Sequence, residues 1–332
     1  MPGSRQLRIR QDKGEQVGTE SYQVGEETQD AVLGALRKLC DGLTWSGARK
    51  LMAARRIGIN GVLCIDEGRR VVSGDLIEVR EQPFPPVPRD PDVQILYLDR
   101  DMVVVNKPSG MLSMRHPGDL SWRQRRKMKQ PALEEVLGRL IQHRDRQRRL
   151  HAPGELQAVH RIDRDTSGIL AFARNERAAE RLIEQFASHR PLRRYFCVIP
   201  GSLPAQTLRS WQVRDRGDGL RGSGPRSRHA QEMITHIKPV RELRGFTEME
   251  CRLETGRTNQ IRIQLAEAGH PICGDVRYRG PFGVEPAADS SRAHRMALHA
   301  AELGLEHPTT GEQLTWRLRW PPDMLRWMDT LR

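Results

Sequence analysis

The sequence predicts an α+β protein of two domains, and three observations favour this class. Some segments place apolar residues at helical spacing, while others alternate apolar and polar residues as strands do. Residues 82–92 contain five prolines, which is typical of a stiff linker, so a small first domain at residues 28–81 and a large second one at residues 93–332 are expected. A chain of 332 residues is long enough for a hydrophobic core in each domain.

The N-terminal part is predicted to begin without structure. Residues 1–27 show no apolar periodicity and are rich in Gln, Glu, Gly and Arg, so they are expected to form a disordered leader. A first helix is predicted to follow, with Thr28 as its N-cap. That helix is indicated by apolar residues at helical spacing, namely Val32, Ala35, Leu36 and Leu39.

A second helix is predicted to open at residues 43–46, and it carries the basic side chains Arg49, Lys50, Arg55 and Arg56. Residues 57–65 form two short apolar runs about an Asn-Gly pair, which predicts a hairpin, and residues 75–79 predict a further strand. This order of elements resembles the S4 RNA-binding domain, which implies that the second helix and the hairpin form an RNA-binding face. The alternative is an unrelated α/β module whose basic helix is only solvated.

The second domain is predicted to begin with two strands at residues 94–98 and 102–105. The loop at residues 106–110, Asn-Lys-Pro-Ser-Gly, is rich in turn-forming residues. Its Lys107 either faces an anionic substrate or is simply solvated, and the pattern leaves both interpretations open.

The segment at residues 115–151 stands out by its charge. It contains eleven Lys and Arg residues against four Asp and Glu residues, a net charge of +7 out of +13 for the whole chain. Apolar residues at helical spacing predict a packed helix between two basic flanks: Ala132, Val136, Leu137, Leu140 and Ile141. The flanks are interpreted as a phosphate-binding arm, and the alternative is a mobile, solvated insertion.

The stretch at residues 158–168, Ala-Val-His-Arg-Ile-Asp-Arg-Asp-Thr-Ser-Gly, packs two acids, two arginines and a histidine just before an apolar run at residues 169–173. The apolar run predicts a buried strand, so the charged block is expected in a tight connection at the edge of a sheet. A carboxylate held there by arginines would stay ionised, which makes Asp163 the candidate reactive group. The alternative is a surface turn in which the four charges pair with one another.

Four further elements are predicted downstream. Asn175 is expected to cap a helix with an apolar face formed by Ala178, Ala179, Leu182, Ile183 and Phe186. Residues 193–199 predict a strand in which Tyr195 faces either the core or a cleft. After a strand at residues 247–253, a further helix places Arg262 beside an apolar stripe, where it either reaches into a cleft or lies exposed; the stripe consists of Ile261, Leu265 and Ala268.

Composition narrows the classes of function. The net charge of +13 suggests a polyanionic partner, most simply a nucleic acid. The five cysteines are far apart, so no zinc site or disulfide framework is expected, and a reducing cytoplasm fits. No secretory signal and no apolar run long enough to cross a bilayer are found, so no membrane partner is expected. The glycine-rich residues 217–224 lack the Gly-Lys-Ser/Thr ending of a phosphate loop.

Five motifs, taken in order, resemble those of the RluA-type RNA pseudouridine synthases. They are residues 106–110, residues 160–168 (His-Arg-Ile-Asp-Arg-Asp-Thr-Ser-Gly), Arg194-Tyr195 with Val198 and Gly201, residues 255–262 (Thr-Gly-Arg-Thr-Asn-Gln-Ile-Arg), and residues 298–300 with 307–312. The resemblance covers about residues 94–325. It implies the α+β pseudouridine synthase fold, a mixed and mainly antiparallel central sheet flanked by helices and loops, and an S4 domain in front is common in that family.

The resemblance also implies roles for the site residues. Asp163 is expected to be the catalytic carboxylate, Arg262 to pair with it, and Tyr195 to stack on the uracil ring. Arg161 and Arg164 are expected to hold phosphates of the flipped nucleotide. Other substrate-binding residues are expected in the motifs and in the first domain: Lys107, Thr166, Arg257, Asn259, Arg49, Lys50, Arg55 and Arg56. No metal and no cofactor are expected.

The partner implied is RNA, with large-subunit ribosomal RNA as the first choice and transfer RNA as the alternative, and the protein is expected to be a monomer. A non-catalytic RNA-binding or ribosome-assembly protein on the same scaffold is a second alternative. The sequence departs from the family's pattern at two places, so the identity of the substrate and the packing of the local loops are not predicted. Asn259 and Gln264 stand where the family usually has histidine, and the basic segment at residues 115–151 is longer than the usual connection.

Overall fold

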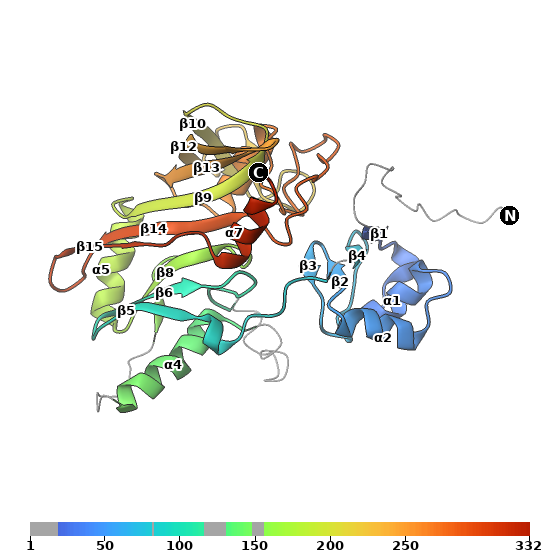
Figure 1. Cartoon of the computed structure of the whole chain (residues 1–332), viewed down its shortest axis with the longest axis horizontal. Coiled ribbons are helices and arrows are strands. Elements are labelled where there is room, and N and C mark those ends of the chain that lie inside the picture. The colour runs from blue at the N-terminus through green and yellow to red at the C-terminus, as the bar shows by residue number, and fades with distance from the viewer. Residues whose placement is uncertain (1–18, 82, 116–130, 148–155) are drawn as a thin grey trace. The chain divides into compact units, whose positions relative to one another are not determined.

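The structure is a computed structural model that describes residues 19–81, 83–115, 131–147 and 156–332, without the side chains of residues 143–147. The chain divides into two compact units, Met1–Pro86 and Val87–Arg332, so the boundary falls inside the proline-rich segment predicted as a linker (Figure 1). Most of the predicted leader, residues 1–18, and most of the two basic flanks, residues 116–130 and 148–151, lie outside the described residues.

The first unit is a four-stranded antiparallel sheet in the order β1 (Thr19–Gln23), β4 (Leu76–Arg80), β2 (Ile57–Ile59) and β3 (Val62–Leu63). Helices α1 (Val32–Leu39) and α2 (Trp45–Ala53) share one hydrophobic core with these strands. The predicted hairpin joins β2 to β3, and Asn60 and Gly61 have φ angles of 52° and 74°. Positive φ at both central residues is what a type I′ turn requires, which explains the Asn-Gly pair.

Two predictions about the N-terminus are wrong. The leader cannot extend to residue 27, because β1 pairs with β4 and buries the side chain of Tyr22, and Val24 after it joins the core. Thr28 does not cap α1, whose N-cap is Ala31. Instead Thr28 ends a 3₁₀ turn, η1 (Glu26–Thr28), and its hydroxyl accepts a hydrogen bond from the backbone N–H of Gly25 (2.8 Å).

The beginning of the predicted linker belongs to the first unit. The ring of Phe84 is buried, its backbone N–H donates to the carbonyl of Arg55 (2.8 Å), and its own carbonyl accepts from Arg55 Nε (3.0 Å). Arg56 Nε likewise donates to the carbonyl of Arg80 (2.6 Å). Arg55 and Arg56, predicted to bind substrate, therefore each donate a side-chain hydrogen bond to the backbone of their own unit. The other end of the linker is a short 3₁₀ helix, η2 (Asp90–Asp92).

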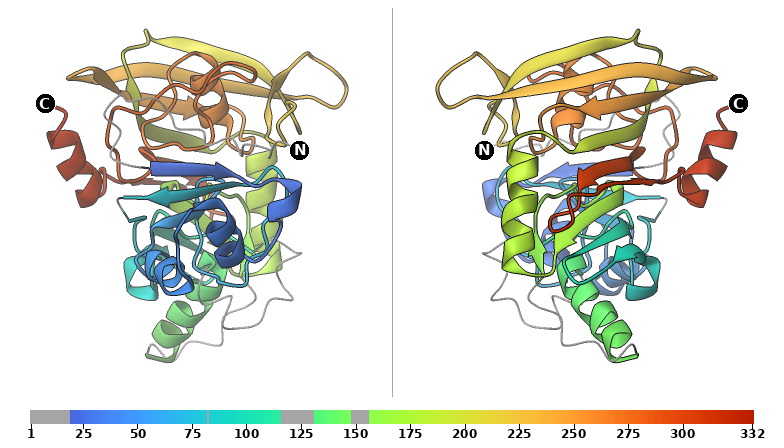
Figure 2. Two further views of the ribbon diagram at one scale, coloured as in Figure 1. Left: turned by 90° about the vertical axis from the view of Figure 1, so that its right-hand side faces the viewer. Right: turned by 90° about the vertical axis from the view of Figure 1, so that its left-hand side faces the viewer.

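The second unit is built around one mixed sheet of eleven strands in the described part of the chain (Figures 1 and 2). Its path runs through β11 (Gly222–Gly224), β10 (Gln206–Val213), β12 (Gln231–Leu243), β13 (Phe246–Leu253), β9 (Leu192–Pro200), β14 (Leu298–Glu306), β8 (Ser167–Ala173), β6 (Met102–Lys107) and β5 (Gln94–Leu98), with β15 (Gln313–Arg317) on β14 and β7 (Gln157–Ala158) on β8. Only the β14–β8 pair among these strands is parallel. The predicted fold class, α+β with a mainly antiparallel sheet, is confirmed.

Helices cover both faces of the β6–β8 part of this sheet. Because side chains alternate along a strand, Val103 and Phe172 pack on one face, with the apolar residues of α4 (Leu133–Gln147), and Val104 and Ala171 on the other, with those of α5 (Glu176–Ala187). The aromatic C-terminal helix α7 (Pro322–Asp329) joins the core on the α4 side. No helix within the described ranges is long and apolar enough to span a membrane.

Gly168 fixes how closely β8 approaches β14. It has a φ of 119° and pairs with Ala300 in the parallel register, and a Cβ atom at this position would collide with the Ala300 backbone. Only glycine tolerates both the positive φ and the close approach. The glycine that ends the charged stretch therefore anchors the loop that precedes it.

Candidate active site

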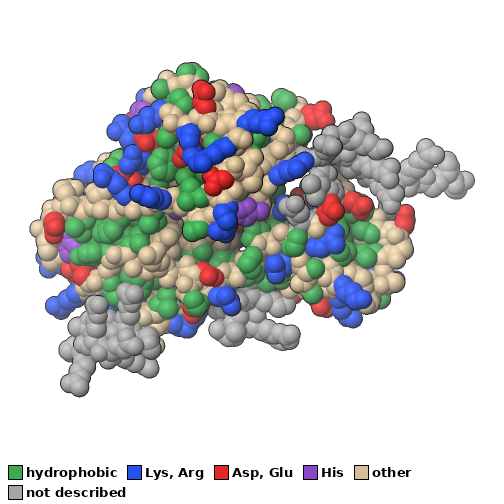
Figure 3. All heavy atoms as spheres, viewed as in Figure 1, with side chains coloured by type: hydrophobic (Ala, Val, Ile, Leu, Met, Phe, Trp, Pro, Cys, Tyr) green, Lys and Arg blue, Asp and Glu red, His purple; other side chains and the backbone are tan. Residues whose placement is uncertain are grey.

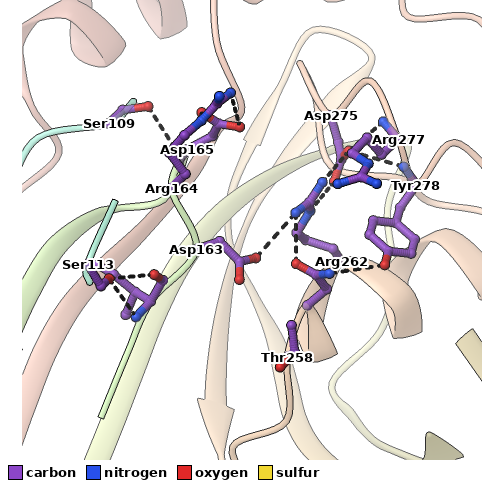
Figure 4. A network of polar contacts seen from close by, with 12 residues as sticks. Ser109, Ser113, Asp163, Arg164, Asp165, Thr258, Arg262, Asp275, Arg277 and Tyr278 are labelled. Atoms are coloured by element: carbon purple, nitrogen blue, oxygen red, sulfur yellow. Dashed lines mark hydrogen bonds and ion pairs between the residues drawn. The ribbon is translucent and has the colours of Figure 1, made fainter. Parts of the chain in front are cut away.

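The loop that carries Asp163 lies between β7 and β8 and is held by the loop that follows β6 (Figure 4). Ser113 Oγ donates to the carbonyl of Ile162 (2.6 Å) and accepts from the N–H of the same residue (3.3 Å). Ser109 Oγ donates to the carbonyl of Asp165 (2.7 Å). These contacts fix the backbone on both sides of Asp163, so its carboxylate stands on a rigid loop.

Lys107 braces the same loop, and the prediction that it binds substrate is wrong. Its side chain is fully buried, and Nζ donates to the carbonyls of Pro108 (3.0 Å), Met111 (2.7 Å) and Arg164 (2.9 Å). Burial lowers the pKa of Lys107 to about 7. A lysine in a turn-rich loop is usually solvated, but here two carbonyls of the same loop and one of the distant loop that carries Asp163 accept from Nζ.

Arg262 reaches Asp163 from α6 (Gln260–Glu267), as predicted. Its Nη1 lies 3.3 Å from Asp163 Oδ2 and also donates to Asn259 Oδ1 (2.9 Å). The arginine side chain is buried, whereas the carboxylate is 19% exposed. One oxygen of Asp163 is thus held by a cation while the side chain remains accessible.

Asp275 and Tyr278 hold the rest of the Arg262 guanidinium (Figure 4). Nε and Nη2 donate to the two oxygens of Asp275 (2.6 and 3.0 Å), and the guanidinium lies 4.8 Å from the centre of the Tyr278 ring. Burial alone would lower the pKa of Arg262, but Asp275, and after it Asp163, outweigh burial and raise it. Arg262 is therefore a permanent cation with one edge turned to Asp163.

Helix α6 is buried on all sides, although the sequence predicts only one buried face. Ala268, expected on that face, is exposed, while every residue from 260 to 266 is buried. Asn259, at the N-cap with a φ of 58°, accepts from Arg262 and donates to the Tyr278 hydroxyl (3.0 Å). Gln264 is packed away from Asp163, and its amide donates to Leu208, Ser210 and Met233. The two departures from the family's histidines are therefore both hydrogen-bonded inside the protein.

Tyr195 and His160 form one wall of the site. Tyr195 on β9 is 8% exposed, and burial raises the pKa of its phenol to about 12. His160 stacks on Phe186 with ring centres 4.3 Å apart, and its Nε2 accepts from the Ala171 N–H (3.0 Å). Burial, helped by Arg193, lowers the pKa of His160 to about 3. At neutral pH both side chains are uncharged. His160 therefore contributes to this wall by packing and hydrogen bonding and cannot act as a cation.

A cavity of about 490 Å³ opens beside Asp163, a size typical of small-ligand sites. Asp163 is the one carboxylate among the lining residues, against the cations Arg161, Arg193, Arg257 and Arg262 and the imidazoles of His160 and His189. Apolar lining comes from Val159, Ile162, Ile183, Phe186, Leu253, Ile261 and Leu298. Such a lining suits a ligand that combines a flat apolar ring with negative charge.

The predicted substrate-binding residues fall into two groups. Arg161, Thr166, Arg257 and Asn259 line the cavity. Arg164 does not, because its guanidinium forms a two-point ion pair with Asp165, at Nε–Oδ1 2.9 Å and Nη2–Oδ2 3.1 Å. The predicted role of Arg164 as a phosphate holder is therefore not supported by its geometry. Arg49 and Lys50 are exposed on α2, and their contacts to RNA remain predictions.

Part of the basic segment at residues 115–151 is structural. Arg115 is buried, and its Nε and Nη2 donate to the two oxygens of Glu135 (2.7 and 2.8 Å). Arg139 forms a similar pair with Asp90, at 3.0 and 2.8 Å. The helix predicted between the flanks is confirmed as α4. Two of the eleven cations of the segment are thus neutralised within the fold.

Sequence reasoning missed Asp275, Tyr278 and Arg193. Asp275 and Tyr278 lie in an irregular segment with no periodicity, thirteen or more positions from Arg262, so no spacing rule links them to it. Arg193 lies two positions before Tyr195 on β9, so both side chains point to the same face of the sheet. The strand pattern of the sequence could have indicated this. Across the described ranges, no group of three or more His, Cys, Asp and Glu side chains is arranged to hold a metal.

A mixed sheet carries a cavity in which a buried arginine pairs with the one lining carboxylate, beside a tyrosine and further arginines. This arrangement agrees with the motifs found in the sequence. The chain belongs to the RNA pseudouridylate synthase family, whose pattern it matches over residues 101–267, and it is an isomerase that acts on RNA. The RluA-type resemblance is thereby confirmed.

Individual relatives extend the match. The chain is 34% identical over 243 residues to an RNA pseudouridine synthase of Bacillus subtilis described as uncharacterized, YlyB, covering 73% of each chain. It is 28% identical over 323 residues to the ribosomal large subunit pseudouridine synthase D of Vibrio cholerae, covering 93% of this chain and 92% of that protein. The solved structure of human RNA pseudouridylate synthase domain containing 4 superposes with a TM-score of 0.55 at 22% identity, covering 72% and 92%. That structural likeness supports the fold.

Proposed function

We propose that this enzyme converts specific uridines of large-subunit ribosomal RNA to pseudouridine, with Asp163 as the catalytic carboxylate. The observation that carries the proposal is that Asp163 is the one carboxylate among the residues that line the cavity, where the other charged side chains are arginines. The RNA target is supported by relatives named ribosomal large subunit pseudouridine synthase D, which align with 90% or more of the chain, including its first unit.

The chemistry requires one nucleophile and no net addition of atoms. Asp163 attacks C1′ of the ribose or assists formation of a glycal, and the bond from C1′ to uracil N1 breaks with its electron pair left on the base. The free uracil turns, and a bond forms between C5 and C1′ as the bond to the carboxylate breaks or, on the glycal route, as C2′ regains the proton that it gave to the carboxylate when the glycal formed. The C5 proton then leaves and N1 gains one. Arg262 holds the carboxylate in line for attack.

The experiment that tests the target uses RNA carrying tritium at uracil C5, because the new C5–C1′ bond releases that hydrogen to water. Transcripts of large-subunit ribosomal RNA and transfer RNA are compared, and release from the ribosomal transcript is expected. Release from transfer RNA alone would favour the transfer-RNA alternative. Mapping pseudouridines in cells with and without the protein then identifies the uridine.

Tyr195 is proposed to support the base and to handle a proton through its hydroxyl. A Tyr195→Phe variant is expected to lower kcat by about 100-fold with little change in KM, because the ring remains while the hydroxyl is lost. Burial raises the pKa of the Tyr195 phenol to about 12, so the group acts in its protonated form at neutral pH. Unchanged kcat in steady-state assays of the phenylalanine variant would confine Tyr195 to stacking.

Arg161, Thr166, Arg257 and Asn259 are proposed to contact the extruded nucleotide from the cavity wall. Moving a uridine out of a folded RNA costs about a few kcal/mol, which phosphate contacts must offset. Arg161 is exposed at the rim, so it can meet the RNA backbone as the nucleotide enters.

The first unit is proposed to contribute RNA affinity through α2. An Arg49→Gln, Lys50→Gln double variant is expected to bind the ribosomal transcript more weakly, with a salt dependence of log K shallower by about 0.7–0.9 per lost phosphate contact. Titrations at several salt concentrations measure this slope. Lys38→Gln on α1 is the control, because it breaks an exposed ion pair on the other helix: Lys38 pairs with Asp30 (3.2 Å) as Arg49 pairs with Glu67 (3.3 Å). An equal effect of both changes would argue against a specific RNA face on α2.

A further inference from the structure

Two neighbouring arginines on β9 point to opposite faces of the sheet and meet opposite environments. Arg194 is neutralised by carboxylates, since Nη1 lies 3.1 Å from Glu250 Oε2 and Nη2 pairs with Glu302. Arg193 lies on the face of Tyr195 and lines the cavity. Of these two adjacent residues, Arg194 has its charge balanced by carboxylates, whereas Arg193 does not.

The guanidinium of Arg193 is almost fully buried and incompletely bonded. The residue is 8% exposed, Nη2 donates to the carbonyl of Glu254 (3.0 Å), and the buried Nε has no hydrogen-bond partner in the described structure, which is true of Arg194 Nε as well. It forms no ion pair with any described carboxylate. Leaving a buried charge without a counter-ion is unfavourable, so such a group usually marks a site that a ligand completes.

The surroundings of Arg193 add positive charge and leave room for its side chain. Arg257 lines the same cavity, and its Nε donates only to a backbone carbonyl, that of Glu232 (3.3 Å). Burial lowers the pKa of Arg193, and Arg257 lowers it further by repulsion. Gly256 stands against Arg193 Nη1, where a Cβ atom would collide with it. The glycine therefore gives the guanidinium its place at the cavity wall.

We propose that Arg193, together with Arg257, forms an anion subsite that binds a phosphodiester of the RNA next to the nucleotide whose base lies on Tyr195. Arg193 and Tyr195 are two positions apart on one face of β9, about 6.6 Å along the strand, so a base and a neighbouring phosphate can occupy them together. The guanidinium fork suits the oxygens of a phosphodiester. The proposal of this subsite rests on the proposed function. It assigns a phosphate contact to Arg193, a buried residue of the cavity wall.

The test is the salt dependence of binding to a single-stranded oligouridylate of about ten nucleotides, measured by fluorescence anisotropy with the full-length protein. Arg193→Gln is expected to lower affinity about tenfold or more and to make the slope of log K against log salt shallower by about 0.7, the value for one lost contact to a single strand. Arg193→Lys keeps the charge and should retain most of the slope. Gly256→Ala should mimic Arg193→Gln, because it displaces the guanidinium without removing it.

Arg194→Gln is the matched control and should leave the slope unchanged, because that charge is already compensated. Wild-type affinity and slope in both Arg193→Gln and Gly256→Ala would overturn the subsite, and so would an equal loss in Arg194→Gln. Thermal unfolding checks each variant, and Gly256→Ala carries the test if Arg193→Gln does not fold. The assay measures binding without turnover. A slope change in a protein that isomerises no ribosomal RNA would therefore contradict the proposed function and leave the subsite standing.

Discussion

The Asp163→Asn variant is expected to lose isomerase turnover by at least about a thousandfold while it keeps its fold and its affinity for RNA. The amide matches the carboxylate in shape and can still accept from Arg262, but it carries no negative charge to attack C1′. Arg262 retains Asp275 as its counter-ion, so the substitution leaves no unpaired buried charge. Tritium release measures turnover, and titration with the same RNA measures affinity.

Asp165→Asn is the matched control for this experiment. Asp165 is two residues away, its side chain is 38% exposed, and it pairs with Arg164 and not with Arg262. It should keep a turnover close to that of the wild type. Turnover near the wild-type rate in Asp163→Asn would remove the catalytic assignment, and a loss of RNA affinity equal to the loss of turnover would point to a binding role for Asp163 instead.

The parts of the fold that follow local rules could be predicted from the sequence. The apolar run after the charged stretch is β8, Asn175 caps α5 by accepting from the Ala178 N–H (2.9 Å), and the Asn-Gly pair makes its hairpin. Each of these depends on residues within a few positions of one another. The place of Asp163 beside Arg262 was predictable too, but only through the resemblance, since the two residues meet across the cavity.

Features that depend on distant partners could not be predicted. Lys107 is predicted in a turn-rich loop, yet it ends strand β6, where it is buried and its Nζ donates to the carbonyls of Met111 and Arg164. Helix α6 has alternating polar residues, yet strands and loops surround it, and Gln264 finds acceptors and donors there. Ile183, expected on the buried face of α5, is 48% exposed and lines the cavity. In each case tertiary contacts determine whether the side chain is buried or exposed, and the periodicity of the sequence alone predicts the opposite.

Loss of the Asp275 carboxylate should lower the stability of the fold substantially, although no motif marks this residue. Its fully buried carboxylate accepts from Arg262 Nε and Nη2 (2.6 and 3.0 Å) and from the backbone N–H groups of Arg277 (2.9 Å) and Tyr278 (3.1 Å). An Asp275→Asn variant cannot satisfy all four donors and leaves Arg262 with Asp163 alone. Breaking a buried ion pair from one side typically costs about 3–5 kcal/mol, and that loss of unfolding free energy is expected in urea titrations.

The pH dependence of stability gives a second readout. Burial would raise the pKa of Asp275, but Arg262 and the two backbone N–H groups outweigh burial and keep the folded pKa below its ordinary value. A depressed folded pKa means that the stabilisation is present above the unfolded value of about 4 and is lost as the pH falls through the folded pKa. The wild type should therefore lose stability below about pH 4, and Asp275→Asn should show a flatter acid limb.

Asp90→Asn separates the effect of burial from the effect of the ion pair itself. Asp90 forms the same two-point contact with Arg139 that Asp275 forms with Arg262, but its side chain is 39% exposed. Its replacement should cost less than about 1 kcal/mol, because water screens the pair and solvates both partners once it is broken. Equal losses for Asp90→Asn and Asp275→Asn would mean that burial does not strengthen the Arg262 pair. A large loss confined to Asp275→Asn would instead support Asp275 as the group that holds Arg262 in place for Asp163.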